Sequence, residues 1–374
     1  MSKKLILPVL VLVLLMPLVG VNGQLISPES VVFDSVHNRY LIADQSLGCI
    51  VAADSAGGLT AFNCLFPAYK GLLLRNDTLF CAASTTGLAL FDLETGDLLT
   101  NIVFDDMTDL NDVIGDTSGN IYVSDAQGSK VHRLHLADMS SEIILDNFPW
   151  ANGMVFDTAN NRILICQWIS HAPLVAINLD DLSVDTVRYD NMYLLDGLAW
   201  DQHGNLYVTS WGDGNVYVYK AGFTEPPVSI ASGYDGPADI AFNYRDTVLA
   251  IPNTTGYRVD FLRLYDPDND LIFNDDDNCP HDYNPGQEDS DSDGIGDVCM
   301  GCCIEQTGNV NCSIVDEPDI TDITRLIDYL YLSHAPLCCP EEADCNGSGG
   351  EPDISDITAL ISYLYIDHLP LSSC

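Results

Sequence analysis

The fold is decided by the stretch Leu195-Asp196-Gly197-Leu198-Ala199-Trp200-Asp201, which is followed by Gly204-Asn205-Leu206-Tyr207-Val208-Thr209 and recurs in variant form along the chain. Each version is a short apolar strand, a turn of Asp, Asn or Gly, and a second β-rich strand. The positions equivalent to Asp196 are 41, 41, 41, 44 and 42 residues apart. Six such units predict a mainly β fold, a six-bladed β-propeller over residues 24–265. An antiparallel sandwich is the alternative, but it would not keep one period for six rounds.

One residue of each unit heads the innermost strand, and in a propeller these residues form a ring at the mouth of the central channel. The ring is Glu29, Lys70, Asn111, Asn152, Asp196 and Ala238. Two carboxylates and two carboxamides that converge on one axis make an all-oxygen site suited to Ca²⁺ or another divalent cation. Ordinary turn chemistry is the alternative, but it does not explain Glu29 or Lys70. We expect the Lys70 ammonium to pair with Glu29 or Asp196, and so to tune the site or to replace the metal.

The order Glu, Asn, Asn, Asp on successive inner strands resembles the gluconolactonase and regucalcin-like propeller family over residues 28–264. The resemblance implies that Glu29, Asn152 and Asp196 are metal ligands. It implies a hydrolase of lactones or sugar-derived esters, in which Asp196 is a general base or oriented ligand and Asn111 contributes directly or through substrate or water. A non-catalytic propeller that binds a carbohydrate or protein partner is the alternative, because fold alone does not establish catalysis.

The formal charge of −41 excludes a general binder of nucleic acids or anionic membranes, since phosphate surfaces repel such a protein. Residues 266–374 carry −24 of this charge, which indicates bound cations; a solvated acidic tail is the alternative. Residues 1–23 join two lysines to a short apolar run and predict a cleaved secretory signal rather than an uncleaved anchor, with no other candidate membrane span. Thirteen cysteines fit a secreted, extracellular or cell-surface protein, and Cys49 and Cys64 flank a turn across which they could be bridged.

Residues 266–300 place carboxylates at every second position, a spacing that like charges tolerate only around a cation. The segment resembles a thrombospondin type 3 repeat. By that likeness Cys279 and Cys299 form a disulfide, calcium has a structural role, and Leu271 weakens the first half because it replaces the usual glycine. The calcium ligands predicted here are Asp266, Asp268, Asp270, Asn274, Asp277, Asp289, Asp291, Asp293 and Asp297.

Two near-copies offset by 34 residues close the chain, and each predicts a polar loop followed by an amphipathic helix. This loop-and-helix unit occurs twice and resembles a type I dockerin, which is a pair of half EF-hands. The resemblance covers residues 309–371 of a tail domain that spans residues 301–374. The first loop has two extra residues and the second has one. The likeness implies calcium binding and docking to a cohesin-type or other cell-surface receptor, although tails of this kind can also serve sorting or retention. The ligands predicted here are Asn309, Asn311, Asp319, Asp322, Asp344, Asn346, Ser348, Asp353 and Asp356.

The tail also allows an interpretation without calcium. Asp319 or Asp322, and Asp353 or Asp356, are suitable helix N-caps. Seven cysteines lie in this region, so disulfides alone could hold a two-helix cap and would leave one cysteine unpaired or intermolecular.

Overall fold

The computed structural model describes residues 24–54, 57–66, 69–273, 276–289, 294, 296, 298–299, 307–311, 318–335, 337, 339, 341–349 and 351–372. The chain forms two compact units, Met1–Tyr265 and Asp266–Cys374. The predicted secretory signal at residues 1–23 lies outside the described residues. Within those residues, no helix has both the length and the apolar character needed to cross a membrane.

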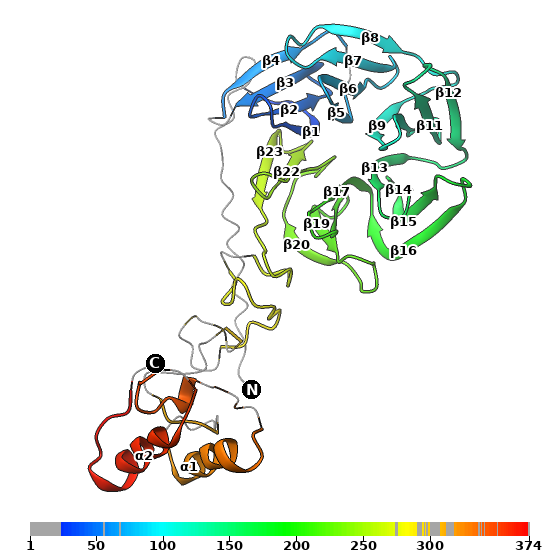
Figure 1. Cartoon of the computed structure of the whole chain (residues 1–374). Coiled ribbons are helices and arrows are strands. Elements are labelled where there is room, and N and C mark those ends of the chain that lie inside the picture. The colour runs from blue at the N-terminus through cyan, green and yellow to red at the C-terminus, as the bar shows by residue number, and fades with distance from the viewer. Residues whose placement is uncertain are drawn as a thin grey trace, which may run out of the picture. The chain divides into compact units, whose positions relative to one another are not determined.

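Antiparallel sheets form a closed ring of six blades in the first unit, as Figure 1 shows, which confirms the predicted mainly β propeller. Over the described residues, blades 1 to 5 have four strands each and blade 6 has three. The strands are β1 (Pro28–Asp34), β2 (Arg39–Asp44), β3 (Cys49–Asp54) and β4 (Leu59–Asn63); β5 (Leu72–Arg75), β6 (Thr78–Ala82), β7 (Leu88–Asp92) and β8 (Leu98–Ile102); β9 (Leu110–Gly115), β10 (Asn120–Asp125), β11 (Lys130–His135) and β12 (Ser141–Leu145); β13 (Ala151–Asp157), β14 (Arg162–Gln167), β15 (Ser170–Asn178) and β16 (Val184–Tyr193); β17 (Leu195–Trp200), β18 (Leu206–Ser210), β19 (Asn215–Tyr219) and β20 (Val228–Ser232); and β21 (Ala241–Asn243), β22 (Val248–Asn253) and β23 (Arg258–Arg263).

The repeated turn after each inner strand is held by an aspartate side chain. In blade 5 the Asp201 carboxylate accepts hydrogen bonds from the backbone amides of His203 and Asn205, at 2.8 and 2.9 Å. Asp116 closes the turn of blade 3 in the same way. A carboxylate that caps its own loop favours a tight reversal, which explains the recurring Asp and Asn at these positions.

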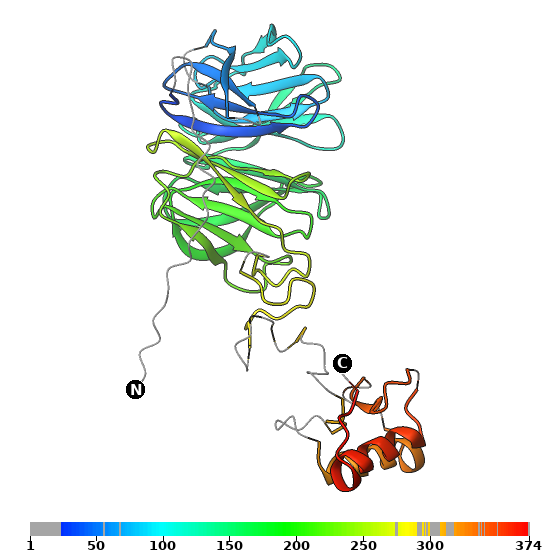
Figure 2. The ribbon, with the colours of Figure 1, turned by 90° about the vertical axis from the view of Figure 1, so that its left-hand side faces the viewer.

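Apolar side chains fill the spaces between successive blades. Leu41 of blade 1 and Leu79 and Phe91 of blade 2, for example, are fully buried in one cluster. Burying a side chain of this size contributes about 1.5–3 kcal/mol. The hydrophobic core is therefore spread around the ring, and Figure 2 shows the resulting disc from a side view.

The ring closes between its first and last blades. Ser30 in β1 and Asp239, just before β21, form a parallel bridge, and the Asp239 amide donates to the Glu29 carbonyl at 2.9 Å. The Ser30 hydroxyl also donates to the Asp239 carboxylate at 2.6 Å. Closure thus takes place beside the ring residue Glu29.

The second unit contains two short helices that contact each other, α1 (Ile320–Ile327) and α2 (Ile354–Ile361). Asp319 and Asp353 are the N-caps, and each forms a capping box with the aspartate three residues later. Each helix continues as a wider π-type turn, η1 (Asp328–Leu332) and η3 (Ser362–Ile366), and a short 3-10 turn, η2 (Glu341–Ala343), lies between the copies. The two near-copies of the sequence thus have the same local structure.

Disulfides form in both units. Cys49 is bonded to Cys64, and Cys279 is bonded to Cys299, as the sequence predicted. In the tail Cys339 is disulfide-bonded, whereas the buried Cys345 is a free thiol. Cys345 is therefore an unpaired cysteine of the kind that the odd number predicted.

Candidate metal centre at the channel mouth

The predicted ring residues lie at the starts of the inner strands. Glu29 lies in β1, Asn111 in β9, Asn152 in β13 and Asp196 in β17. Neighbouring inner strands contact each other all the way around the axis. The four oxygen-bearing side chains are also buried, so the structure gathers them at one end of the channel as expected.

Glycines after the ring residues let the inner strands approach closely. A Cβ atom on Gly153 would lie 1.9 Å from the Asp196 carbonyl oxygen, and one on Gly197 would lie 2.5 Å from the Ile240 amide nitrogen. Neither position can accept a side chain without moving the neighbouring backbone. The Asn-Gly and Asp-Gly pairs in the sequence therefore set the width of the mouth where Asn152 and Asp196 lie.

Three of the ring residues carry a buried oxygen without a hydrogen-bond partner. Within the described part of the chain, these atoms are Glu29 Oε2, Asn152 Oδ1 and Asp196 Oδ1. A buried polar atom without a partner costs about 1–3 kcal/mol, and a charged one costs more. Three such acceptors in one ring fit a bound cation, and oxygen donors of this type suit a hard divalent ion.

The protonation of these carboxylates follows from their burial. Burial raises the pKa of Asp196 to about 7, against the lowering effects of the nearby Asn152 side chain and of the Lys70 charge. Burial also raises the pKa of Glu29 well above its usual range, and the negative charge of Asp196 adds to this effect. A cation between them would oppose both shifts, because its positive charge stabilises the ionised carboxylates.

Two further carboxylates, the buried Asp112 and the half-buried Asp239, were missed by the sequence analysis. Each directly follows a ring position. Burial raises the pKa of Asp112 to about 6, although the Met154 and Val113 amides donate to it, and burial also raises the pKa of Asp239. An aspartate inside the inner strand β9 was the signal that could have revealed Asp112, whereas Asp239 lies before the short strand β21. The negative charge of Asp112 adds to the rise in the pKa of Glu29 and of Asp196.

The predicted pairing of Lys70 is wrong. Its ammonium lies 2.9 Å from the Asp109 carboxylate, not beside Glu29 or Asp196. Asp109 also accepts hydrogen bonds from Ser84 and Gln127. A local partner from the loop before β9 thus holds the ammonium, and Lys70 acts on the ring only through its charge, which lowers the pKa of Glu29 and Asp196.

Comparison with known proteins identifies the propeller. Residues 27–245, more than half of the chain, match the sequence profile of the family described as SMP-30/Gluconolactonase/LRE-like region. The chain belongs to this family. No curated protein sequence matches it.

Solved structures share the fold of this gluconolactonase-like propeller. A gluconolactonase from Xanthomonas campestris is 15% identical, with a TM-score of 0.57 over 64% of this chain and 86% of the other. A calcium-binding protein, regucalcin, from Agrobacterium tumefaciens is 16% identical, with a TM-score of 0.54 over 64% of this chain and 90% of the other. A chain of a nidogen/laminin complex is 14% identical, with a TM-score of 0.50 over 60% and 93%. At these identities the likeness shows the fold alone.

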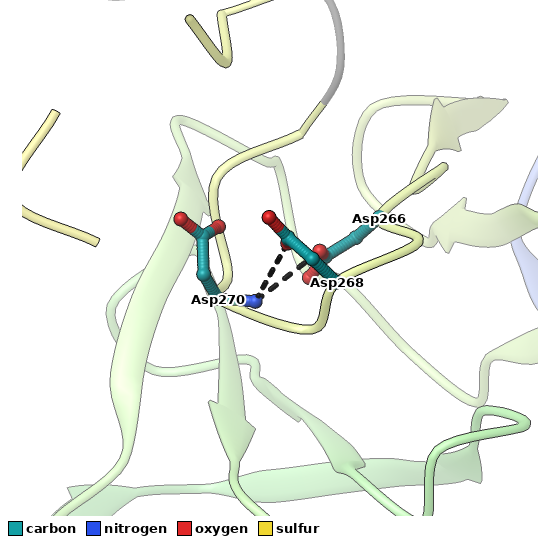
Figure 3. A group of neighbouring side chains, drawn as sticks. All are labelled: Asp266, Asp268 and Asp270. Carbon is teal, nitrogen blue, oxygen red and sulfur yellow. Dashed lines mark hydrogen bonds between the residues drawn. The ribbon is translucent and has the colours of Figure 1, made fainter. Parts of the chain in front are cut away.

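A second candidate metal site lies outside the family propeller, in residues 266–300, which we call the acidic stalk. One carboxylate oxygen from each of Asp266, Asp268 and Asp270 lies within 4.8 Å of the others (Figure 3). The Asp270 amide donates to the carboxylates of Asp266 and Asp268, at 3.3 and 3.2 Å, which folds the segment into a loop. Burial raises the pKa of Asp268. The structure thus brings together the first three predicted stalk ligands.

The remaining stalk ligands are only partly described. Asp277 has a buried oxygen without a hydrogen-bond partner in the described region, while its other oxygen accepts from the Cys279 amide and from Gln287. Asp289 accepts a hydrogen bond from the Gly294 amide at 3.0 Å. The other predicted ligands here lie outside the described residues: Asn274, Asp291, Asp293 and Asp297.

Leu271 holds a backbone conformation that favours glycine. Its φ angle is +74°, and Gly294, which follows the second acidic run, has a φ of +95°. A left-handed residue other than glycine costs roughly 1–2 kcal/mol. The first acidic loop therefore carries strain that the glycine expected at this position would remove.

The tail loops place their predicted ligands in matching pairs. The Asn311 amide donates to the Asp322 carboxylate at 2.9 Å, and the Asn346 amide donates to that of Asp356 at 3.2 Å. Asp344 accepts the amide of Ser348 at 3.0 Å. The capping residues Asp319 and Asp353 bind helix amides, and Asn309 is buried. The structure thus joins each loop to the first turn of its helix in the same way.

Proposed function

We propose that the propeller is a metal-dependent hydrolase of lactones or sugar-derived esters. The observation that carries this proposal is the set of three buried, unpaired oxygens of Glu29, Asn152 and Asp196 at the channel mouth of a gluconolactonase-like fold. The description of the Xanthomonas relative as a gluconolactonase, and of the Agrobacterium relative as calcium-binding, supports it.

Each ring residue has a defined role in this proposal. Glu29, Asn152 and Asp196 would hold Ca²⁺ or another divalent cation. A cation in this place polarises a carbonyl and lowers the pKa of water. Asp196 then accepts the proton of the attacking water or fixes its orientation. Asn111, buried on the neighbouring inner strand, orients the substrate carbonyl or the water by hydrogen bonding.

A panel of lactones, assayed with calcium and with chelator, tests the proposal. The wild-type chain should hydrolyse at least one lactone only in the presence of metal, and Asp196→Ala should abolish this turnover. Asp185→Ala is the matched control, because Asp185 is an exposed aspartate on the outer strand β16. Absence of turnover by calcium-loaded wild type, or full activity in chelator, would contradict the proposal.

A binding function without catalysis is the second candidate. The observation that favours it is the Lys70–Asp109 ion pair beside the mouth, which places a cationic side chain next to the ring. The chain of the nidogen/laminin complex that shares this fold belongs to a binding assembly. A wild-type chain that takes up calcium, hydrolyses no lactone and binds a carbohydrate or protein partner would favour this function.

We also propose that the chain is exported and that its tail docks to a cohesin-type or cell-surface receptor, with calcium stiffening the stalk. Disulfides such as Cys279–Cys299 persist mainly in oxidising compartments. The helix copies also expose large apolar side chains at equivalent positions, which suits a docking surface; they are Tyr331 and Leu332 in one copy, and Tyr365 and Ile366 in the other.

Deletion of residues 309–371 tests the attachment. The truncated chain should appear in the medium, while the full chain should stay at the cell surface in calcium. If the truncated chain remains attached, or if the full chain is not exported, this part of the proposal is wrong.

A further inference from the structure

Three of the four tryptophans gather at one side of the channel mouth. Trp150 directly precedes β13, Trp168 directly follows β14, and Trp211 directly follows β18. The ring centroids of Trp150 and Trp168 are 5.9 Å apart, and those of Trp168 and Trp211 are 5.7 Å apart. The cluster therefore joins blades 4 and 5 in one continuous row of indoles.

The row lies at the strand ends that carry two of the ring residues. Ala151 pairs with Gln167, and Leu195 pairs with Ser210, so the tryptophans that follow β14 and β18 lie beside the starts of β13 and β17. The Trp168 amide also donates to the Trp150 carbonyl at 3.0 Å. Asn152 and Asp196, which start from these same strand ends, share the rim with the indoles.

The fold leaves these three indole side chains partly exposed. Trp150 is 44% exposed, and Trp168 and Trp211 are partly exposed. Trp200, in contrast, donates its indole N–H to the Phe156 carbonyl at 3.2 Å. None of the three rim indoles donates its N–H to another described residue. Trp150 moreover has a left-handed backbone, with φ +56°, which is costly for a bulky residue.

We propose that these three tryptophans form a platform that binds the ring of a neutral sugar lactone. Partly exposed indoles suit a sugar, whose C–H face packs on an aromatic ring while its hydroxyls form hydrogen bonds to polar groups nearby. The unpaired oxygens of Asn152 and Asp196 on the same rim complement those hydroxyls or the metal. The platform determines substrate specificity and rests on the proposed lactonase function.

A binding measurement tests the platform without turnover. Gluconolactam, a stable amide analogue of the sugar lactone, is titrated into the calcium-loaded chain, and tryptophan fluorescence is recorded. The signal should change with saturation, whereas valerolactam, which has the same ring without hydroxyls, should bind far more weakly. Trp168→Ala should weaken gluconolactam binding about tenfold or more, as expected for the loss of one stacking surface.

Control variants separate recognition from folding. Trp168→Phe should keep most of the affinity, because it keeps an aromatic face. Trp150→Ala removes an exposed ring and should also weaken binding while leaving the melting temperature unchanged. Tyr189→Ala should bind like wild type, since Tyr189 is an exposed aromatic residue on the outer strand of the same blade. Wild-type affinity in both Trp168→Ala and Trp150→Ala, or no binding of gluconolactam by wild type, would overturn the platform.

Kinetics distinguish the platform from the proposed function. In a working lactonase, Trp150→Ala should raise KM for gluconolactone about tenfold and leave KM for valerolactone unchanged. Hydrolysis with an unchanged KM for both lactones would reject the platform and keep the enzyme. Platform-dependent gluconolactam binding without any hydrolysis would keep the platform and reject the enzyme.

Discussion

The channel mouth and the acidic stalk both concentrate carboxylates, but they hold them in opposite ways. At the mouth, Glu29 and Asp196 are buried near the ends of hydrogen-bonded strands. The hydrophobic core that stabilises these strands lies between the blades. In the stalk, Asp266, Asp268 and Asp270 lie in a loop without regular secondary structure, in which backbone amides donate to the acids themselves. The Cys279–Cys299 disulfide lies further along the same segment.

The difference separates two uses of a cation. The propeller is folded by apolar packing, so an ion at its mouth would relieve a local electrostatic cost and would supply the chemistry proposed above. The described residues of the stalk form no regular helix or strand, so an ion bound there would supply folding energy directly. Removal of calcium should therefore act on activity in the first unit and on structure in the second.

The largest expected effect comes from replacing the Asp196 carboxylate at the channel mouth with a neutral amide. Asp196→Asn should lower lactone turnover by at least about a hundredfold. Without metal it should instead stabilise the propeller by a few kcal/mol near neutral pH, because it removes a buried charge whose pKa is raised to about 7. Melting curves in chelator and in calcium test this, because Asp196→Asn should raise the melting temperature in chelator but not in calcium, where the variant lacks a metal ligand. A lower melting temperature in both conditions would show that Asp196 is merely structural.

Removal of the stalk disulfide should leave the channel mouth intact. The double substitution Cys279→Ser and Cys299→Ser opens a loop with a sequence separation of 20 residues, which should cost about 3 kcal/mol of stability in the second unit. Limited proteolysis should then cut residues 266–300 while lactone turnover persists. Loss of turnover together with the stalk would show that the two regions are not independent.

A smaller effect on calcium affinity is expected from replacing Leu271 in the stalk. Leu271→Gly should strengthen calcium binding by the first acidic loop by about 1 kcal/mol, because glycine accepts the φ of +74° without strain. Leu271→Ala is the matched control, since it removes the side chain but keeps the strain. Calorimetric titration should rank Gly above both Leu and Ala. Equal gains from Gly and Ala would indicate that side-chain size, and not backbone conformation, limits the site.

The smallest expected effect concerns pH. Burial raises the pKa of Asp112 to about 6 and that of Asp196 to about 7, above the ordinary value of 3.8. The metal-free folded chain holds these protons when the unfolded chain has lost them, so their contribution to stability falls as the pH rises from about 4 to about 7. Calcium uptake near pH 6 should therefore release protons, and Asp196→Asn should release fewer. Calorimetry in two buffers of different ionisation enthalpy measures the release, and equal values for both proteins would contradict the assignment.

The sequence predicted the parts of the molecule that repeat. The period of the inner strands located Glu29, Asn111, Asn152 and Asp196 at one mouth, because every blade repeats one geometry. The paired helices and the Cys279–Cys299 bond followed equally from local pattern or likeness.

Pairings between loops could not be predicted in this way. Lys70 pairs with Asp109, which precedes the next inner strand and has no fixed place in the repeat. Asp112 and Asp239 were overlooked because the ring was defined by one position in each blade, and each of them is the residue after that position. The tryptophan row likewise joins residues that precede and follow strands in two blades.

Calcium titration of the full chain by calorimetry, with melting followed in parallel, tests the central claim most directly. The account predicts uptake of more than one Ca²⁺ per chain, with the melting temperature of the second unit lowered by chelator. A chain that takes up no Ca²⁺, and whose melting is the same with and without chelator, would contradict the claim that its crowded carboxylates enclose divalent ions.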